Sequence, residues 1–467
     1  MLLDRKLKHT ASLVLLTLVA AVAPGYAQTV QAVPETGQQA SGSDKPAAQI
    51  VVNKDMVLDS AVETPAETVV AATAQTPPVL SATSEQALAS SLSDLGLAML
   101  RAQSAQKGQA QSNEVISSLS LANGLGLTHA GSAGESAREI ALLLSGAPSV
   151  DRVFSRDYPA LLTKLTPKVG GPLVMANRVW VDKAIAAQVE PVYAKVVQSR
   201  FTSEGSTIDF SKTEVARKAI NAWASRQTDG RIAELLSGGA LSGQTRFVLT
   251  NAVHFKGLWQ QPFDAKLTSS RPFFIAPKVS QDVPTMQRTL AVRAGEVGNV
   301  SVLELPFAGD EYSLLLAMPP EGHTLNAMEI DLSGNDMVQW LAQIKPATCL
   351  VALPKFSIEP KSVSLKPLLQ GLGMHTVFGN LADFTPMLGA KGKELVLDDV
   401  YQAAGITIDE SGGEAVAATA VVAVSKAFKS PQVTPNCVIN RPFLFAIVHR
   451  ASAVPVVMGK VVNPTVK

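Results

Sequence analysis

One stretch near the end of the chain has a hydrophobic pattern unlike the rest. Residues 405–408 alternate in polarity as a strand does, and two acidic residues and a pair of glycines follow. Residues 415–424 then form an unbroken run of alanine, valine and one threonine. Such a run fits a crowded sheet at about 3.3 Å per residue. The chain beyond it is polar and contains prolines, so we predict a strand without a hairpin partner, followed by an exposed loop.

The two faces of this run differ in size when residues are counted in steps of two. One face carries only small side chains: Gly413, Ala415, Ala417, Thr419, Val421 and Ala423. The other face carries Glu414, Val416, Ala418, Ala420, Val422 and Val424. Read in isolation, the run is explained more simply as an ordinary strand or buried helix rich in alanine and valine.

Hydrophobic periodicity elsewhere predicts a mixture of helices and strands. A helix is expected from Thr83, which forms a capping box with Gln86 and precedes a regular apolar face. A second helix is expected to be capped by Ser132 with Glu135 and to stop at Gly146. A third helix is expected at residues 190–199 and strands at residues 173–181 and 312–318, and residues 247–259 look like a strand and its exit.

The first 27 residues read as a secretory signal peptide. Basic Arg5, Lys6 and Lys8 precede an apolar centre at residues 11–23, and small residues at 25–27 suit a cleavage site. The apolar centre is shorter than the roughly 20 residues that a membrane span needs. We therefore expect export to the periplasm or the extracellular space, and no membrane span.

Residues 28–82 predict a disordered linker or tether. They are rich in Ala, Thr, Gln, Val and Pro, contain no aromatic residue and lack a steady period. The ordered domain is therefore expected at residues 83–467.

The whole chain has 467 residues, of which 46% are hydrophobic and 17% charged. Its formal charge of +1 gives no field that would favour nucleic acid as a partner.

Nothing in the motifs indicates an enzyme, a metal or a cofactor. The sequence contains no Gly-x-Ser-x-Gly, His-Glu-x-x-His or Cys-x-x-Cys motif, and no two of its six histidines have metal-ligand spacing. A Ser-His-Asp triad built from distant positions stays open at this stage. Cys349 and Cys437 are the two cysteines, and sequence leaves open whether they form one bridge or two separate thiols.

A resemblance to a known family changes the interpretation of the small-residue run. Residues 410–419, Glu-Ser-Gly-Gly-Glu-Ala-Val-Ala-Ala-Thr, resemble the hinge of the reactive-centre loop of serpins. Residues 440–445, Asn-Arg-Pro-Phe-Leu-Phe, and residues 459–464, Gly-Lys-Val-Val-Asn-Pro, resemble the signature that follows that loop. The match is to the inhibitory type, bacterial members included, and covers about Thr83 to Pro464.

The resemblance implies a serpin-like α/β (α+β) fold. It has about three β-sheets with a dominant central sheet A, eight or nine helices and an exposed reactive-centre loop at about residues 410–438. It also implies suicide inhibition, in which a protease cuts the loop, forms an acyl-enzyme and is trapped when the hinge inserts into the sheet. The expected hinge residues are Glu410, Gly412, Gly413, Glu414, Ala415, Ala417, Ala418 and Thr419. Gly413 stands where many inhibitors carry Thr or Ser.

The usual family spacing from Glu410 places the scissile bond between Lys426 and Ala427. Lysine there suits a trypsin-like serine protease with an acidic specificity pocket. The segment before Pro442 is several residues longer than usual, so Phe428 and Lys429 are alternative sites.

The resemblance also implies a cluster of residues where the sheet must part. Ser117, Ser120 and Asn251 match its buried polar members, and Trp259 matches the aromatic near the hinge entry. Gln402 stands where the family often has a histidine.

We therefore predict an exported monomeric inhibitor whose partner is a serine protease, held in a covalent complex without any cofactor. Two alternatives are a non-inhibitory serpin that acts as a binding or structural protein, and an inhibitor of a cysteine protease.

Overall fold

The computed structural model describes residues 82–105, 112–145, 157–165, 171–201, 204–413 and 437–466. The predicted signal peptide and nearly all of the predicted linker lie outside these ranges and stay predictions. The predicted ordered domain begins within one residue of the first described helix, α1 (Ala82–Ser104).

One sheet has five strands in the order β10-β11-β4-β2-β3. Their bounds are β2 Leu173–Asp182, β3 Glu204–Ile208, β4 Phe247–Phe255, β10 Phe356–Ser364 and β11 Asp399–Ile408. The pairs β11–β4 and β2–β3 are parallel, and the other pairs are antiparallel. β4 is buried along its whole length, as expected for a strand covered on both faces.

A second sheet holds the remaining eight strands in the order β1-β13-β12-β8-β7-β6-β5, with β9 also paired to β6. The strands are β1 Glu114–Ile116, β5 Ser269–Ala276, β6 Val279–Val297, β7 Val300–Pro306, β8 Tyr312–Met318, β9 Lys345–Pro354, β12 Phe443–His449 and β13 Val454–Val461. The described residues thus form two sheets where about three were expected. The reason is β6, which is 19 residues long and pairs in succession with β5, β9 and β7.

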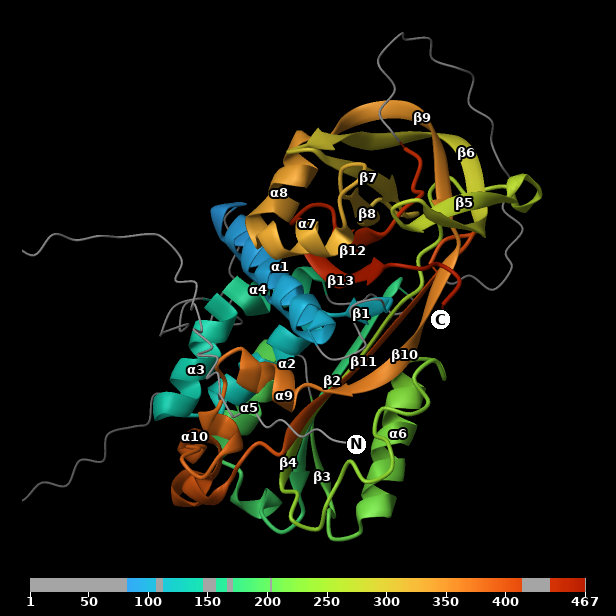
Figure 1. Cartoon of the computed structure of the whole chain (residues 1–467). Coiled ribbons are helices and arrows are strands. Elements are labelled where there is room, and N and C mark those ends of the chain that lie inside the picture. The colour runs from blue at the N-terminus through green and yellow to red at the C-terminus, as the bar shows by residue number, and fades with distance from the viewer. Residues whose placement is uncertain are drawn as a thin grey trace, which may run out of the picture. The chain divides into compact units, whose positions relative to one another are not determined.

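Ten α-helices occur in the described residues, where eight or nine were expected, because short ones such as α10 are included. Besides α1 they are α2 Ser118–Ala130, α3 Gly134–Ser145, α4 Tyr158–Leu165, α5 Pro191–Phe201, α6 Thr213–Gln227, α7 Leu325–Asp331, α8 Gly334–Gln343, α9 Lys366–Gly371 and α10 Thr385–Leu388. Figure 1 shows α6 against one face of the five-stranded sheet and α2 against the other.

Two predicted helix caps are wrong. Thr83 was expected to cap the first helix, but α1 begins at Ala82, so Thr83 lies within its first turn. Ser132 was expected to cap a helix together with Glu135, but α3 begins later, at Gly134. The hydroxyl of Ser132 instead donates a hydrogen bond back to the carbonyl of His129, at the end of α2. The hydroxyl of a serine between two helices can bond to the backbone of either helix, and here it bonds to the end of the preceding one.

The alternation of side chains along β4 separates two hydrophobic cores. Phe247, Leu249 and Val253 point into the larger core, which includes α2. Val248 and Ala252 point into a smaller core that lies under α6. A strand that is apolar on both faces is thereby fixed between two layers, as its pattern predicts.

Candidate functional site

A parallel seam between β4 and β11 lies inside the five-stranded sheet. Residues 399–405 of β11 pair with residues 248–254 of β4 in continuous register. Parallel pairing is slightly less stable per residue than antiparallel pairing. A third strand that entered here in the opposite direction would replace one parallel pair by two antiparallel pairs. The seam is therefore a place where this sheet can gain stability by accepting a strand.

The chain turns sharply where β11 ends beside this seam. The carboxylate of Asp409 accepts hydrogen bonds from the backbone N–H groups of Ser411 (2.8 Å) and Gly412 (3.2 Å). Gly412 has φ of +146°, and a Cβ atom there would lie 2.1 Å from the carbonyl oxygen of Gly257. Only glycine fits this position, because any side chain would be strained and would collide with the backbone. Gly413 then donates a 2.6 Å hydrogen bond to the same carbonyl.

Glu410 fastens this turn to the neighbouring strands. Its carboxylate accepts a hydrogen bond from the hydroxyl of Thr268 (2.7 Å) and forms an ion pair with the ammonium of Lys355 (2.7 Å). Partial burial alone would raise the pKa of Glu410, but the hydrogen bonds from Lys355 and Thr268 outweigh it and hold the pKa below its usual value. The start of the predicted hinge is therefore anchored while the carboxylate stays ionised.

Ser117, Ser120, Asn251 and Gln402 come together under the seam. The amide of Gln402 makes two 3.0 Å hydrogen bonds with Ser117, accepting from its N–H and donating to its carbonyl. The hydroxyl of Ser117 donates to the carbonyl of Val456 (2.7 Å) on β13. The N–H of Ser120 donates to the Ser117 hydroxyl (3.1 Å), so the turn that starts α2 belongs to the same network. Four predicted residues thus form one chain of buried hydrogen bonds that spans both sides of the seam.

A fifth residue of this network, Asn177 on β2, was missed. Its side-chain oxygen Oδ1 accepts hydrogen bonds from the hydroxyl of Ser120 and the side-chain amide of Asn251, both at 2.6 Å. The amide of Asn251 also donates to the carbonyl of Ser120 (3.2 Å). The signal in the sequence was a lone amide inside the apolar strand 173–181, but its partner could be assigned only once the register of β2 and β4 was known.

Trp259 belongs to the hinge end of the seam. Its indole N–H donates to the carbonyl of Asp409 (2.8 Å), and its ring stacks on Phe307 with centroids 4.6 Å apart. Its backbone N–H donates to the carbonyl of Ser411 (2.8 Å). The predicted set is thus divided: Trp259 holds the turn, and the four polar residues hold the interior of the seam.

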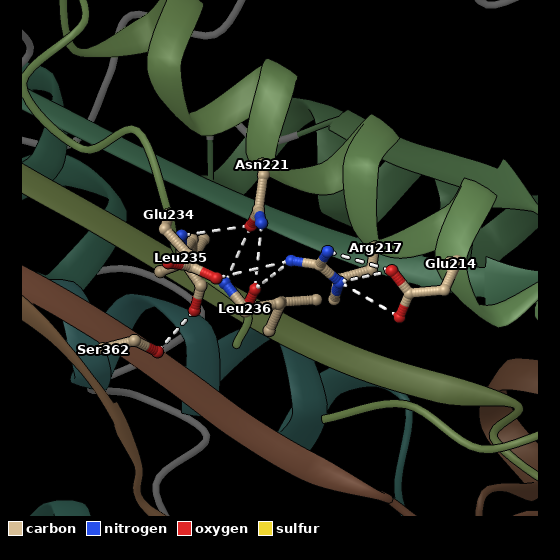
Figure 2. Close-up of polar contacts among 7 residues, drawn as sticks. All are labelled: Glu214, Arg217, Asn221, Glu234, Leu235, Leu236 and Ser362. Carbon is tan, nitrogen blue, oxygen red and sulfur yellow. Dashed lines mark hydrogen bonds and ion pairs between the residues drawn. The ribbon is translucent and has the colours of Figure 1, made fainter. Parts of the chain in front are cut away.

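The segment between α6 and β4, residues 228–246, crosses the face of the sheet, and we refer to it as the strap. The side-chain carbonyl of Asn221 accepts from the N–H groups of Leu235 (3.0 Å) and Leu236 (2.7 Å), as Figure 2 shows. On the sheet side, the hydroxyl of Ser362 on β10 donates to the carbonyl of Leu235. The hydroxyl of Tyr401 on β11 donates to the carbonyl of Ala240 (2.8 Å).

The strap therefore links the two sides of the seam. It continues directly into β4, yet its carbonyls at Leu235 and Ala240 accept hydrogen bonds from β10 and β11. On the β2 side, α6 itself is held by Trp223, which contacts Trp180 edge to face with centroids 5.6 Å apart. A strand entering the seam would move β4 and β11 apart by about 4.8 Å, so one set of these contacts must break.

Comparison with known proteins agrees with this geometry. A family model described as serpin (serine protease inhibitor) matches residues 90–464. The chain belongs to the serpin family. It is 32% identical over 338 residues to the antitrypsin of Bombyx mori, covering 71% of this chain and 84% of that protein.

Solved structures confirm the predicted serpin fold. Native protease nexin-1 with heparin matches with a TM-score of 0.70 and 27% identity, covering 81% of this chain and 100% of that one. Human thyroxine-binding globulin in complex with thyroxine matches with a TM-score of 0.70 and 25% identity, covering 82% and 100%. These two structures hold different ligands, heparin and thyroxine.

A disulfide closes the serpin domain near the end of the predicted loop. Cys349 on β9 is bonded to Cys437, with their Cα atoms 6.3 Å apart. The carbonyl of Cys437 also accepts from the N–H of Ala352 (3.1 Å), and the N–H of Ile439 donates to the carbonyl of Ala352 (2.8 Å). The alternative of two separate thiols, which the sequence left open, is thereby settled in favour of one bridge.

Most of the predicted reactive-centre loop lies outside the described residues. The positions concerned are the hinge residues Glu414, Ala415, Ala417, Ala418 and Thr419 and the scissile candidates Lys426, Ala427, Phe428 and Lys429. Their roles stay predictions.

None of the helices in the described ranges combines the length and apolar character needed to cross a bilayer. Within the same ranges, no three His, Cys, Asp or Glu side chains gather where they could hold a metal ion.

Proposed function

We propose that this serpin is an exported, monomeric suicide-substrate inhibitor of a trypsin-like serine protease, cut after Lys426. The observation that carries the proposal is the closed parallel seam between β4 and β11, with the anchored turn at residues 409–413 beside its end. A chain that leaves this turn and enters the seam runs antiparallel to both neighbours. The sheet can therefore accept the hinge as a new central strand.

The proposed reaction begins as ordinary proteolysis. The serine hydroxyl of the protease attacks the carbonyl carbon of Lys426, forms an ester with it, and loses its proton to the protease base. The peptide bond to Ala427 breaks, and the amine of Ala427 leaves with a proton from that base. The N-terminal side of the cut is then free to move while it carries the protease as an ester.

Insertion of the hinge is the step that would trap the protease. The small face of residues 413–423 meets little steric resistance in a closed core, whereas a bulky or charged side chain there would be strongly disfavoured. The turn at Gly412 allows the reversal of direction that insertion needs. Distortion of the ester-linked active site would then stop hydrolysis.

Two features support the choice of partner. Lysine before the scissile bond matches a specificity pocket with an acidic residue, and a relative with 32% identity bears the name antitrypsin.

The basic, apolar and small-residue regions of residues 1–27 support export. A target outside the cytoplasm is consistent with the disulfide, which persists in oxidising compartments.

The test mixes the mature protein with trypsin and resolves the products on a reducing denaturing gel. We expect a band near the summed mass of protease and inhibitor, and mass spectrometry should find a fragment that begins at Ala427. The variant Lys426→Ala should lose the complex with trypsin. Cleavage at Phe428 or Lys429 would place the reactive bond elsewhere while keeping the mechanism.

A matched pair of hinge variants tests insertion itself. Ala417→Arg places a charge on the predicted inward face and should turn the inhibitor into a substrate that is cut without a complex. Ala418→Arg places the same charge on the outward face and should leave complex formation intact. Clean cleavage of the wild type, with no gain in thermal stability afterwards, would favour a non-inhibitory serpin. A complex that forms only with a papain-like enzyme would favour a cysteine protease target.

A further inference from the structure

Two buried carboxylates face one lysine at the junction of α1, α7, β1 and β13. The ammonium of Lys460 lies 3.6 Å from a carboxylate oxygen of Glu114 and 3.6 Å from one of Glu329. The side chains of these three residues are 3%, 6% and 2% exposed, respectively. Glu114 and Lys460 are also direct partners in the antiparallel ladder of β1 and β13. The cluster is therefore fixed in position and shielded from water.

The carboxylates are poorly compensated. In the part of the chain that the structure describes, one oxygen of Glu114 and both oxygens of Glu329 are buried without a hydrogen-bond partner. The other oxygen of Glu114 accepts from the hydroxyl of Ser112 (3.2 Å). Lys460 divides its donors further, because it also contacts the hydroxyl of Ser104 on α1. Two negative charges thus share one ammonium.

Among the residues that the structure describes, Arg101 on α1 is a second cation that faces the cluster. It attracts the carboxylate of Glu329, but its guanidinium donates to backbone carbonyls, at 2.9 Å and 2.6 Å to that of Glu329 and also to that of Leu332. Arg101 therefore holds the end of α7 rather than the carboxylate oxygens. Fully ionised, Glu114, Glu329 and Lys460 would bury a net negative charge, which is costly in a dry interior.

Burial has the expected effect on both acids. It raises the pKa of Glu114 to about 7, against the opposing attraction of Lys460 and the hydrogen bond from Ser112. Burial also raises the pKa of Glu329, against the attraction of Lys460 and Arg101. Because the two carboxylates repel each other, a proton on either one relieves the pair as a whole.

We propose that the cluster of Glu114, Glu329 and Lys460 takes up one proton on folding and is a pH-sensitive tie between β1, α7 and β13. A carboxyl whose pKa is raised in the folded state stabilises the protein at low pH, and that contribution is lost as the pH rises through the folded pKa. The stabilisation is therefore greatest below the usual pKa of 4.5, falls as the pH rises, and is lost above about pH 7. This inference is independent of the proposed protease target.

The position of the cluster gives the tie a structural consequence. β1 ends at Ile116, and the next residue is Ser117, which makes both hydrogen bonds to Gln402 on β11. A weaker hold on β1 above neutral pH thus loosens the segment that leads into the seam. The expected effect is that the closed protein is kinetically more stable in mildly acidic than in alkaline solution.

The test compares unfolding rates of the full chain in urea at pH 6 and pH 8.5. The wild-type rate should rise by up to about tenfold, the factor by which a group of pKa about 7 stabilises the folded state less over this range. Glu114→Gln should remove most of this rise and should unfold more slowly than the wild type at pH 8.5. Glu135→Gln, at an exposed ion pair on α3, is the control and should keep the wild-type rise.

A second variant and a direct readout keep the proposal testable if Glu114→Gln folds poorly. Glu329→Gln also leaves one carboxylate for one ammonium, so it should flatten the same profile. Infrared difference spectra of protein with carbon-13-labelled glutamate should show a protonated carboxyl that is lost between pH 6 and pH 8.5. An unchanged pH profile in both variants, or no such carboxyl signal in the wild type, would overturn the proposal.

Discussion

Replacing Cys349 and Cys437 by alanine would release the C-terminal boundary of the predicted reactive-centre loop from β9. The two cysteines are 88 residues apart in sequence. With that separation, the chain-entropy expression for closing a loop gives about 4.6 kcal/mol at room temperature as the stabilisation by the disulfide. Alanine is preferable to serine because both sites are buried, at 3% and 2% exposure, and a hydroxyl there would need a partner.

The assay is urea unfolding of the full chain, followed by circular dichroism, for three samples. These are the oxidised wild type, the reduced wild type and the double alanine variant. The reduced wild type keeps both sulfur atoms, so it separates the loss of the chain constraint from the loss of side-chain packing. Thr348→Ala, on an exposed position of the same strand, is the control and should leave the midpoint unchanged. If all three samples unfolded at the same midpoint, the argument from loop closure would be refuted.

Three further predictions concern the seam and its surroundings. Gln402→Leu leaves the buried N–H of Ser117 unpaired, whereas the Ser117 carbonyl still accepts from the N–H of Leu121 (3.1 Å), so the variant should lower the free energy of unfolding by about 1–3 kcal/mol, measured in urea. Glu410→Gln removes a carboxylate whose pKa is lowered in the folded protein. In the wild type this carboxylate stabilises the fold above its usual pKa of 4.5, and that contribution is lost as the pH falls below this value. The variant should lack this loss, a difference of about 1 kcal/mol or less in an acid titration of unfolding. Ser362→Ala removes the bond from β10 to the strap and should speed the uptake of a synthetic peptide of residues 414–423 on native gels; an unchanged rate would mean that the strap does not restrain the seam.

The serpin fold was predicted from a resemblance spread along the chain, whereas single strands and the glycine turn after β11 could be predicted from local signals. The apolar run of β8 was predicted at its observed bounds, Tyr312–Met318. The glycines and acids after β11 carried a recognisable pattern, and Gly412 proves to occupy a backbone conformation that only glycine adopts without strain. Such features depend on short-range sterics and on periodicity, which a single sequence contains.

The parts that escaped prediction depend on long-range register. Asn177 joins the polar network only because β2 and β4 place it opposite Asn251. The pairing of the cysteines needed a distance between β9 and a segment 88 residues later. The expected cap at Ser132 failed because two helix ends compete for one hydroxyl. In each case the residue type was visible, while its partner was set by the assembled sheets.

The disulfide makes the predicted scissile bond part of a covalent ring. Lys426 and Ala427 lie between Cys349 and Cys437, so cutting between them opens the ring without dividing the molecule. Residues 427–467 would remain attached to the body through β9 after the protease has acted. In a trapped complex, the protease would be joined to Lys426 by the ester, and residues 427–467 would be joined to Cys349 by the disulfide. Only a reductant would break the covalent link to this C-terminal fragment. In an oxidising compartment, the protease and both fragments of the cleaved inhibitor would therefore stay joined in one covalent complex.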